Sequence, residues 1–169
     1  MKYPEKYEAR VKLKDGDEVL LRPVKTTDVK LATDFYRKLS ARTKYLRFFT
    51  PKKEATEDRI KNFTTVNYKT SMVILAISGD EMVGAARYDW DKNEKYLELA
   101  ETVRDDWQGK GVGTVLFRHI IKIAKENGYN SLTVLILGEN KNALTILKKT
   151  VGELKMKAEG NFIRATFDI

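Results

Sequence analysis

Three glycines within six residues are the first part of this sequence that could do chemistry. Residues 108–113 read QGKGVG, between a segment with the pattern of a strand and a segment with the pattern of a helix. Glycine permits positive φ angles and a close approach of the backbone to a ligand, so successive N–H groups can point at one anion. A helix that begins here adds partial positive charge. The stretch therefore predicts a cradle for a phosphate or pyrophosphate, with an ordinary tight turn as the alternative.

Two well-known phosphate-binding patterns do not fit this stretch. A P-loop needs Gly-Lys followed by Ser or Thr, whereas Lys110 is followed by Gly111. The dinucleotide fingerprint needs G-x-G-x-x-G, whereas Gly109, Gly111 and Gly113 are each two residues apart. What remains is a Gln-x-x-Gly-x-Gly pattern that begins at Gln108.

Composition excludes several other kinds of site. The sequence has no cysteine, and therefore no disulfide framework, thiol nucleophile or thiolate metal ligand. A single histidine, His119, leaves no histidine-rich metal cluster, so no metal is expected, and a packing or surface role is expected for His119.

Charge and hydropathy indicate the partners and the compartment. The net charge of +8 should attract nucleotides, nucleic acid or acidic proteins, but no DNA- or RNA-binding motif is present, so nucleic acid is not expected as the primary ligand. No apolar run approaches the roughly 18 residues that cross a bilayer, and residues 1–12 lack the pattern of a signal peptide. These features predict a cytoplasmic protein without a membrane partner.

The elements that must position the glycine stretch follow from the hydrophobic pattern. In the first half we expect a hairpin around Gly16, a helix capped by Thr27 or Asp28, a second helix, a second hairpin and a further strand. These expected elements comprise residues 10–13, 18–22, 28–39, 57–63, 72–78, 82–88 and 95–103. Alternation along the last of these strands places Glu101 on the apolar face with Leu97 and Leu99.

The second half continues the same alternation of strands and helices. A long helix with apolar residues at 112, 116, 120 and 123 should end at Gly128, and residues 131–137 read as a strand buried on both faces. A short helix over 140–149 and a closing hairpin over 153–157 and 161–169 follow. The pattern predicts one α+β domain over residues 1–169, with a mixed sheet.

With its flanks, the glycine stretch resembles the GNAT superfamily of N-acetyltransferases. Residues 103–117, VRDDWQGKGVGTVLF, match the strand-loop-helix unit with which that superfamily holds the pyrophosphate of acetyl-CoA, and Asn140 lies where it places an asparagine that contacts the pantetheine arm. The resemblance implies the GNAT fold, a mostly antiparallel twisted central sheet flanked by helices, with acetyl-CoA as co-substrate. The acetyl-CoA contacts it implies are Val103, Gln108, Gly109, Lys110, Gly111, Val112, Gly113, Thr114 and Asn140.

A narrower resemblance begins near Leu13 and covers the chain from there to its end. Residues 14–28, KDGDEVLLRPVKTTD, and residues 39–49, LSARTKYLRFF, are similar to the GNAT domain of Pat-type protein lysine acetyltransferases. This resemblance implies direct transfer to a protein lysine in a ternary complex, with an acyl-CoA synthetase, or a basic chromatin protein in an archaeal source, as the acceptor. The segment 45–49 would then lie close to the acceptor groove, where Arg47 could orient an acidic partner. We favour the interpretation that Leu46, Phe48 and Phe49 pack against the first helices.

Acetyl transfer to an amine requires a base. A lysine amine, with a reference pKa near 10.4, is mostly protonated at neutral pH and attacks only as the free base. The resemblance places the catalytic glutamate about ten residues before the motif glutamine, which corresponds to Glu98. Glu101, the acid within an apolar stripe, is the alternate base, and a water chain is a third route.

The sequence leaves open the group that protonates the departing thiolate and two alternative functions. Many members of the superfamily protonate the departing thiolate with a tyrosine at the position that Leu147 occupies here, so the proton donor is not identified. This departure also leaves a non-catalytic acyl-CoA-binding domain as an alternative. A small-molecule amine acetyltransferase is another, although a net charge of +8 suits polycations poorly. The sequence does not determine the oligomeric state.

Overall fold

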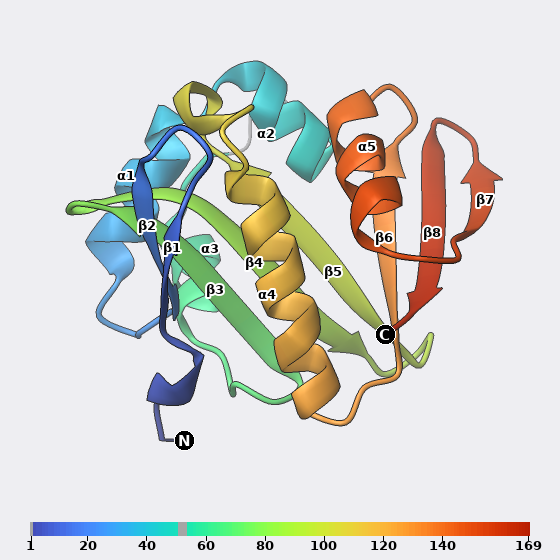
Figure 1. Ribbon diagram of the computed structural model, residues 1–169, viewed down its shortest axis with the longest axis horizontal. Helices are drawn as coiled ribbons and strands as arrows, with labels where there is room; N and C mark the ends of the chain where they lie inside the picture. The colour runs from blue at the N-terminus through green and yellow to red at the C-terminus, as the bar shows by residue number, and fades with distance from the viewer. Residues whose placement is uncertain (1, 51–53) are drawn as a thin grey trace.

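The computed structural model describes residues 2–50 and 54–169 of the chain, and its architecture is a single eight-stranded sheet flanked by helices (Figure 1). The strand order is β1-β2-β3-β4-β5-β6-β8-β7. Every neighbouring pair is antiparallel except β5 and β6, which are parallel. The predicted α+β class with a mixed, mostly antiparallel sheet is confirmed.

The N-terminal half begins with a short 3₁₀ turn and the predicted hairpin. Three helices follow the hairpin, and a three-stranded meander follows the helices. The bounds are η1 Glu5–Tyr7, β1 Ala9–Lys12, β2 Glu18–Pro23, α1 Val29–Lys38, α2 Ala41–Phe48, α3 Glu57–Thr64, β3 Ser71–Ser78, β4 Glu81–Asp91 and β5 Tyr96–Val103. All of these strands lie where the alternation predicted them, within three residues at each end.

The C-terminal half alternates helices and strands, as predicted. Its elements are η2 Asp105–Trp107, α4 Val112–Glu126, β6 Ser131–Leu137, α5 Lys141–Thr150, β7 Lys155–Glu159 and β8 Phe162–Asp168. Gly128 follows α4 with a φ of 89°, the left-handed conformation expected of a residue that ends a helix.

Two details of the first half differ from the sequence prediction. Helix α2 was not predicted, and it begins at Ser40, whose hydroxyl accepts a hydrogen bond from Thr43 N. Asp28 precedes α1 but does not cap it with its side chain. Its carboxylate instead accepts hydrogen bonds from Arg22, at 2.7 and 2.8 Å, and from Lys25 N, at 2.7 Å, which tie β2 to the start of α1.

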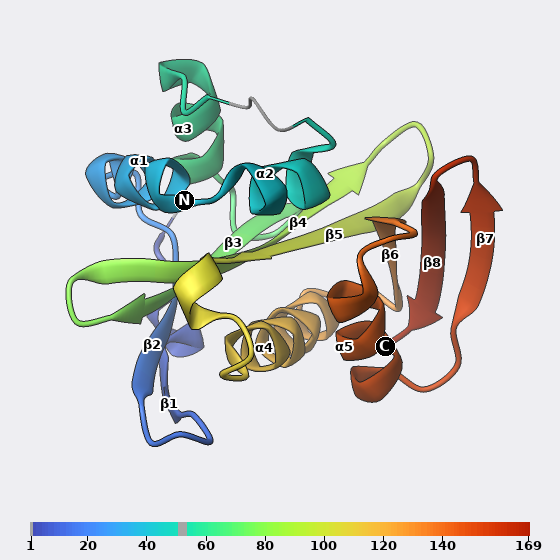
Figure 2. The same cartoon turned by 90° about the horizontal axis from the view of Figure 1, so that it is seen from above.

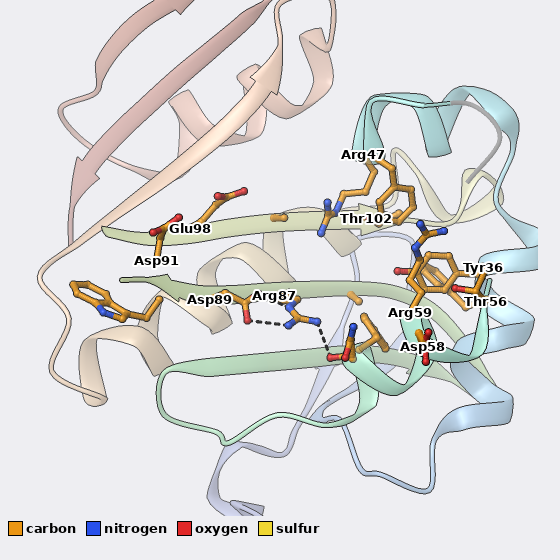
Figure 3. Close-up of a pocket in the computed structure, with 17 residues that line it drawn as sticks. Tyr36, Arg47, Thr56, Asp58, Arg59, Arg87, Asp89, Asp91, Glu98 and Thr102 are labelled. Carbon is orange, nitrogen blue, oxygen red and sulfur yellow. Dashed lines mark hydrogen bonds and ion pairs between the residues drawn. The ribbon is translucent and has the colours of Figure 1, made fainter. Parts of the chain in front are cut away.

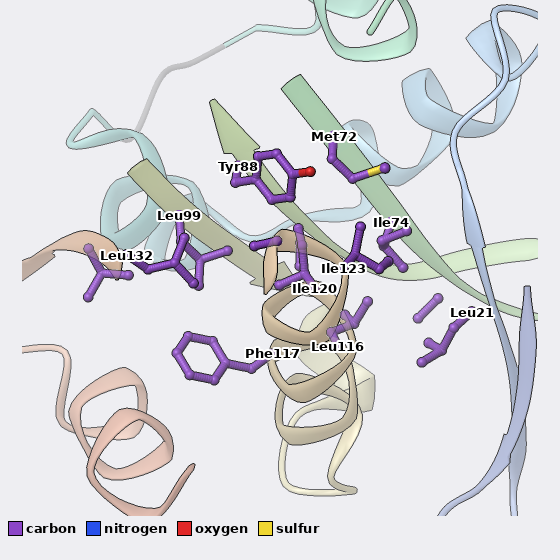
Figure 4. Packing of buried hydrophobic residues seen from close by; sticks show 14 of the residues in the cluster. Leu21, Met72, Ile74, Tyr88, Leu99, Leu116, Phe117, Ile120, Ile123 and Leu132 are labelled. Carbon is purple, nitrogen blue, oxygen red and sulfur yellow. The ribbon is translucent and has the colours of Figure 1, made fainter. Parts of the chain in front are cut away.

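The helices cover opposite faces of the sheet. Helices α1, α2 and α3 lie on one face and α4 and α5 on the other (Figure 2). The larger core cluster packs α4 against the sheet, where Leu116, Ile120 and Ile123 meet Ile74 and Leu99 (Figure 4). A Cβ at Gly84 would lie 2.9 Å from Leu116 Cδ1, so only glycine lets α4 cross the sheet this closely.

Strands β5 and β6 separate from one another soon after they meet. Their parallel pairing is registered only at Glu98 and Thr133, whereas β6 pairs with β8 along its whole length, from Ser131 to Leu137. The two strands therefore diverge toward their carboxyl ends, and the glycine stretch follows the end of β5. The resulting opening is the β5–β6 cleft described below.

Candidate active site

The backbone of the glycine stretch has the conformation that an anion cradle needs. Gly109 and Gly111 have φ angles of 78° and 95°, and a Cβ on either would meet nothing within 4 Å. Left-handed backbone, and not crowding, therefore requires glycine at both positions. Helix α4 begins directly after Gly111 without a side-chain cap. The first-turn N–H groups of Val112, Gly113 and Thr114 thus lack intrahelical partners and can bind an anion.

Gln108 closes the loop and does not point into the cradle. Its side-chain Nε2 donates to Val103 O at 3.0 Å and to Thr43 Oγ1 at 3.2 Å. The neighbouring carboxylate of Asp105 accepts hydrogen bonds from Ser40 N, Ser40 Oγ and Thr43 Oγ1. The end of β5, the cradle and the start of α2 are therefore held together as one unit.

Lys110 is directed toward the β1–β2 turn. Its ammonium lies 2.7 Å from Asp17 Oδ2, 3.1 Å from Asp15 Oδ2 and 4.7 Å from the centre of the Trp107 ring. Hydrogen bonds to these two carboxylates raise the pKa of Lys110. The Lys110 ammonium, which the resemblance implies as an acetyl-CoA contact, is thus already paired with two carboxylates.

The third glycine serves packing. A Cβ at Gly113 would lie 2.6 Å from Glu101 Oε1 and 3.1 Å from Ile146 Cδ1. The carboxyl group of Glu101 therefore rests against the first turn of α4, beside the cradle. The spacing of the three glycines reflects two needs, backbone conformation at the first two and space for Glu101 at the third.

The β5–β6 cleft has a volume of about 110 Å³ and extends from the carboxyl group of Glu101 between the two strands. Its lining is mostly apolar and comes from α2, both strands, α4 and α5. The lining residues are Leu46, Arg47, Phe49, Glu98, Leu99, Ala100, Glu101, Phe117, Val134, Leu135, Ile136, Asn140, Ala143, Ile146 and Leu147. Asn140 both lines the cleft and caps α5, because its Oδ1 accepts a hydrogen bond from Ala143 N at 3.2 Å. Leu147 lies within the same wall.

Glu101 is the unusual residue of the cleft. Its Oε2 is fully buried and has no hydrogen-bond partner among residues 2–50 and 54–169. Burial raises the pKa of Glu101 well above its usual range, because an ionised carboxylate without donors is costly in an apolar site. The prediction that Glu101 interrupts an apolar stripe is confirmed.

A larger cavity, of about 580 Å³, lies on the opposite face of β4 and β5, under α1, α2 and α3 (Figure 3). We call it the charged cavity. Its lining residues are Phe35, Tyr36, Arg47, Phe48, Thr56, Asp58, Arg59, Asn62, Phe63, Ala85, Arg87, Asp89, Trp90, Asp91, Glu98, Ala100 and Thr102.

Charge is distributed unevenly in the charged cavity. Arg47 and Arg59 lie at one end, Asp91 and Glu98 lie at the other, and Arg87 forms an ion pair with Asp89 between them (Figure 3). Asp89 is also the cross-strand partner of Glu98. Arg87 further donates to Asn62 O at 3.0 Å.

The two spaces meet at Glu98. Arg47, Glu98 and Ala100 line both the charged cavity and the β5–β6 cleft. Glu98 is exposed and is also the residue at which β5 contacts β6. Arg47 forms no hydrogen bond or ion pair within the part of the chain that the structure describes. Burial lowers the pKa of the Arg47 guanidinium, whereas the negative charges of Glu98 and Asp89 raise it.

The aromatic segment after α1 is only partly a packing element. Phe48 stacks on Tyr36 of α1 with ring centres 5.5 Å apart, as the favoured interpretation expected. Phe49 instead meets Phe162 of β8, edge to face at 4.8 Å, and Leu46 lines the β5–β6 cleft. These two residues therefore pack at the cleft, because α2 extends over the gap between β5 and β6.

Several residues of the charged cavity were not predicted from the sequence. No sequence motif includes Arg59, Arg87, Trp90 or Asp91. Only the alternation along one strand, which places residues 87, 89 and 91 on the same face, could have indicated some of these lining residues. His119, in contrast, lies outside both spaces, with Nε2 2.8 Å from Tyr7 O.

Residues 2–50 and 54–169 lack two other kinds of feature. No group of three or more histidine, aspartate or glutamate side chains is arranged to hold a metal ion. No helix in the same residues combines the length and the apolar character needed to span a membrane.

Comparison with known proteins identifies the family. Residues 18–150 match the Acetyltransferase (GNAT) domain family. The chain is 34% identical over 124 residues to acetyltransferase PA5475 of Pseudomonas aeruginosa, which covers 71% of this chain and 67% of that protein. It is 29% identical over 133 residues to acetyltransferase Pat of Mycolicibacterium smegmatis, covering 77% of this chain but only 40% of that longer protein.

Solved structures agree with this assignment. The GNAT domain of S. lividans PAT superposes with a TM-score of 0.93 at 28% identity, over 99% of this chain and 100% of that domain. A complex of RimL, a ribosomal L7/L12 α-N-protein acetyltransferase, with coenzyme A shares the fold, with a TM-score of 0.70 at 11% identity over 89% of this chain and 93% of that one. The chain therefore belongs to the GNAT family of N-acetyltransferases, enzymes that use acetyl-CoA as co-substrate.

Proposed function

We propose that this protein transfers the acetyl group of acetyl-CoA to a protein lysine, directly in a ternary complex, with Glu98 as the base. The observation that carries the proposal is the position of Glu98, where the β5–β6 cleft and the charged cavity meet. An acyl donor in the cleft and an amine in the charged cavity would approach one another beside this carboxylate.

The cradle and the cleft fit acetyl-CoA. The free N–H groups at the start of α4 suit a pyrophosphate, and the narrow apolar cleft with Asn140 at its side suits a pantetheine arm. Acetyl-CoA supplies an activated thioester at this place. Gln108 and Val103 contribute by holding the loop closed, and Lys110 adds positive charge to the cradle only when it leaves Asp15 and Asp17, which neutralise it here.

The charged cavity fits the lysine. Asp91 and Glu98 attract an ammonium group, and Glu98 accepts its proton so that the free amine can attack. Because Glu98 is exposed, it can return that proton to water. A volume of about 580 Å³ exceeds the needs of one lysine side chain, which supports a peptide segment as the acceptor. The sequence resemblance to Pat-type enzymes supports the same substrate class.

Glu98→Gln provides the test. We expect kcat for a lysine-bearing acyl-CoA synthetase to fall by about 10²-fold or more, because general base catalysis contributes about 10²–10⁴, while the Kd for acetyl-CoA stays within about twofold. Thiol release and calorimetric titration measure the two quantities. Glu94→Gln, an exposed change of the same kind in the loop before β5, is the matched control and should leave both unchanged.

A panel of acceptors distinguishes the alternatives. Free lysine, a polyamine and the protein acceptor are compared at equal amine concentration. A higher kcat/KM for the polyamine would contradict the protein-lysine proposal and indicate a small-molecule enzyme. Tight binding of acetyl-CoA without thiol release from any acceptor would instead indicate a regulatory acyl-CoA-binding domain.

A further inference from the structure

One buried ionisable group has no part in the mechanism above. Glu101 extends from β5 to the face opposite the charged cavity, into the β5–β6 cleft. A Cβ on Gly113 would lie only 2.6 Å from Glu101 Oε1. The other carboxyl oxygen, Oε2, is buried and accepts no hydrogen bond from any described residue. A glycine in the first turn of α4 thus leaves space for a carboxyl group that contributes no hydrogen bond to the fold.

The surroundings of Glu101 favour its protonated form. The other titratable groups that line the cleft are Glu98 and Arg47, while α4 and α5 face it with the backbone at Gly113 and with apolar side chains. The α4 N-terminus would favour the carboxylate, but Oε2 receives no N–H from it. Desolvation therefore dominates, and the pKa of Glu101 is raised.

The cleft offers few other proton donors. No serine, threonine, tyrosine, histidine or lysine occurs among the described residues that line it, and Leu147 fills part of the α5 wall. Glu98 is exposed and serves as base in the proposed function, and the guanidinium of Arg47 does not release a proton near neutral pH. Two carboxyl groups in contrasting environments on one strand can divide the tasks of base and acid.

We propose that Glu101, as a neutral carboxylic acid, contacts the sulfur of bound CoA and protonates it as the thiolate leaves. This inference rests on the proposed function. Glu98 accepts a proton from the ammonium, the C–N bond forms, the C–S bond breaks, and the amide nitrogen loses its second proton to water. Glu101 transfers its proton to sulfur and regains one from water. One proton is released overall, and the products are the amide and the free thiol.

The protonation state of Glu101 can be observed without turnover. In protein labelled with ¹³C at the glutamate side-chain carboxyl carbons, NMR at pH 7 should show one carboxyl that is still protonated and that is missing from Glu101→Gln. If every glutamate carboxyl is ionised at pH 7, the proposal fails.

Kinetics then test the role in the reaction. Because a general acid must be protonated, wild-type kcat should fall as the pH rises through the pKa of Glu101. Glu101→Gln should lose that alkaline limb and about 10²-fold in kcat, with the Kd for acetyl-CoA within about twofold of wild type. An unchanged kcat, or loss of an acidic limb as expected for a base, would overturn the assignment.

A second pair of variants keeps the test independent of folding defects. Leu147→Tyr in the Glu101→Gln background places a hydroxyl donor in the same cleft, and Leu147→Phe in that background adds the ring without the donor. The tyrosine variant should exceed the phenylalanine variant by at least about tenfold in kcat, and equal rates would contradict the proposal. If wild type acetylates no acceptor, the proposed function fails, while the NMR result for Glu101 still stands.

Discussion

At the scale of single residues, the site depends on where three glycines and two glutamates lie. Gly109 and Gly111 allow the left-handed backbone of the cradle, and Gly113 allows Glu101 to lie against α4. Glu98 and Glu101 are only three residues apart in the sequence, yet one is exposed in the charged cavity and the other has a buried carboxyl oxygen in the cleft. Their different environments suit Glu98 to the proposed role of base and Glu101 to the proposed role of acid.

The contact between Gly113 and Glu101 leads to a prediction about stability. Gly113→Ala should lower the free energy of unfolding by about 1–3 kcal/mol, because the new methyl group would lie 2.6 Å from Glu101 Oε1. In a Glu101→Ala background the same change should cost much less. Urea unfolding of the four proteins in this cycle measures the coupling. Equal costs in both backgrounds would show that the two residues do not touch.

At the scale of elements, α2 links the cradle to the charged cavity. Asp105 and Gln108 hold the start of α2 against the cradle, and the same helix carries Arg47 into the charged cavity. Helix α2 was not predicted, although Ser40 is a typical N-cap residue and Ala41, Tyr45 and Phe48 recur at helical spacing. A helix of eight residues has too few apolar positions for its period to stand out from the sequence. Its position depends on tertiary contacts that the local pattern does not encode.

Loss of this link should affect binding of acetyl-CoA. Asp105→Ala removes the acceptor for three hydrogen bonds from Ser40 and Thr43, so we expect a several-fold increase in the Kd for acetyl-CoA and a fall of about 1 kcal/mol in the free energy of unfolding. Calorimetry and denaturation provide the measurements. Asp106→Ala, which affects the neighbouring pair with Arg104, is the control for the Kd. Similar Kd values for the two variants would argue against the link.

At the scale of the whole molecule, the sheet positions groups from distant parts of the chain. The strands, and the glycine stretch between β5 and α4, could be predicted because alternation and motif spacing are local properties. The charged cavity could not, because Arg47, Arg59, Asp91 and Glu98 come from four different elements. The sequence also did not indicate that Gln108 closes the loop or that Lys110 pairs with Asp15 and Asp17.

The arrangement of charge predicts the character of the acceptor. Arg47 is without an ion pair among the described residues, and the net charge is +8, so a lysine peptide with an acidic residue nearby should have a KM about tenfold lower than its neutral analogue. Arg47→Gln should abolish this preference, whereas Arg37→Gln, an exposed change of the same charge on α1, should keep it. Steady-state kinetics measure KM for the two peptides with each variant. A preference for basic flanks would contradict the prediction.

The most direct test of the central claim is a single-turnover reaction of the acetyl-CoA complex with a lysine-bearing protein acceptor, followed by intact mass and thiol release. If Glu98 promotes direct transfer between the two spaces, acetyl-lysine and free thiol will appear together, no acetylated enzyme will precede them, and Glu98→Gln will slow both by about 10²-fold or more. Acetylated enzyme that forms before the product, or an unchanged rate in Glu98→Gln, would contradict the account.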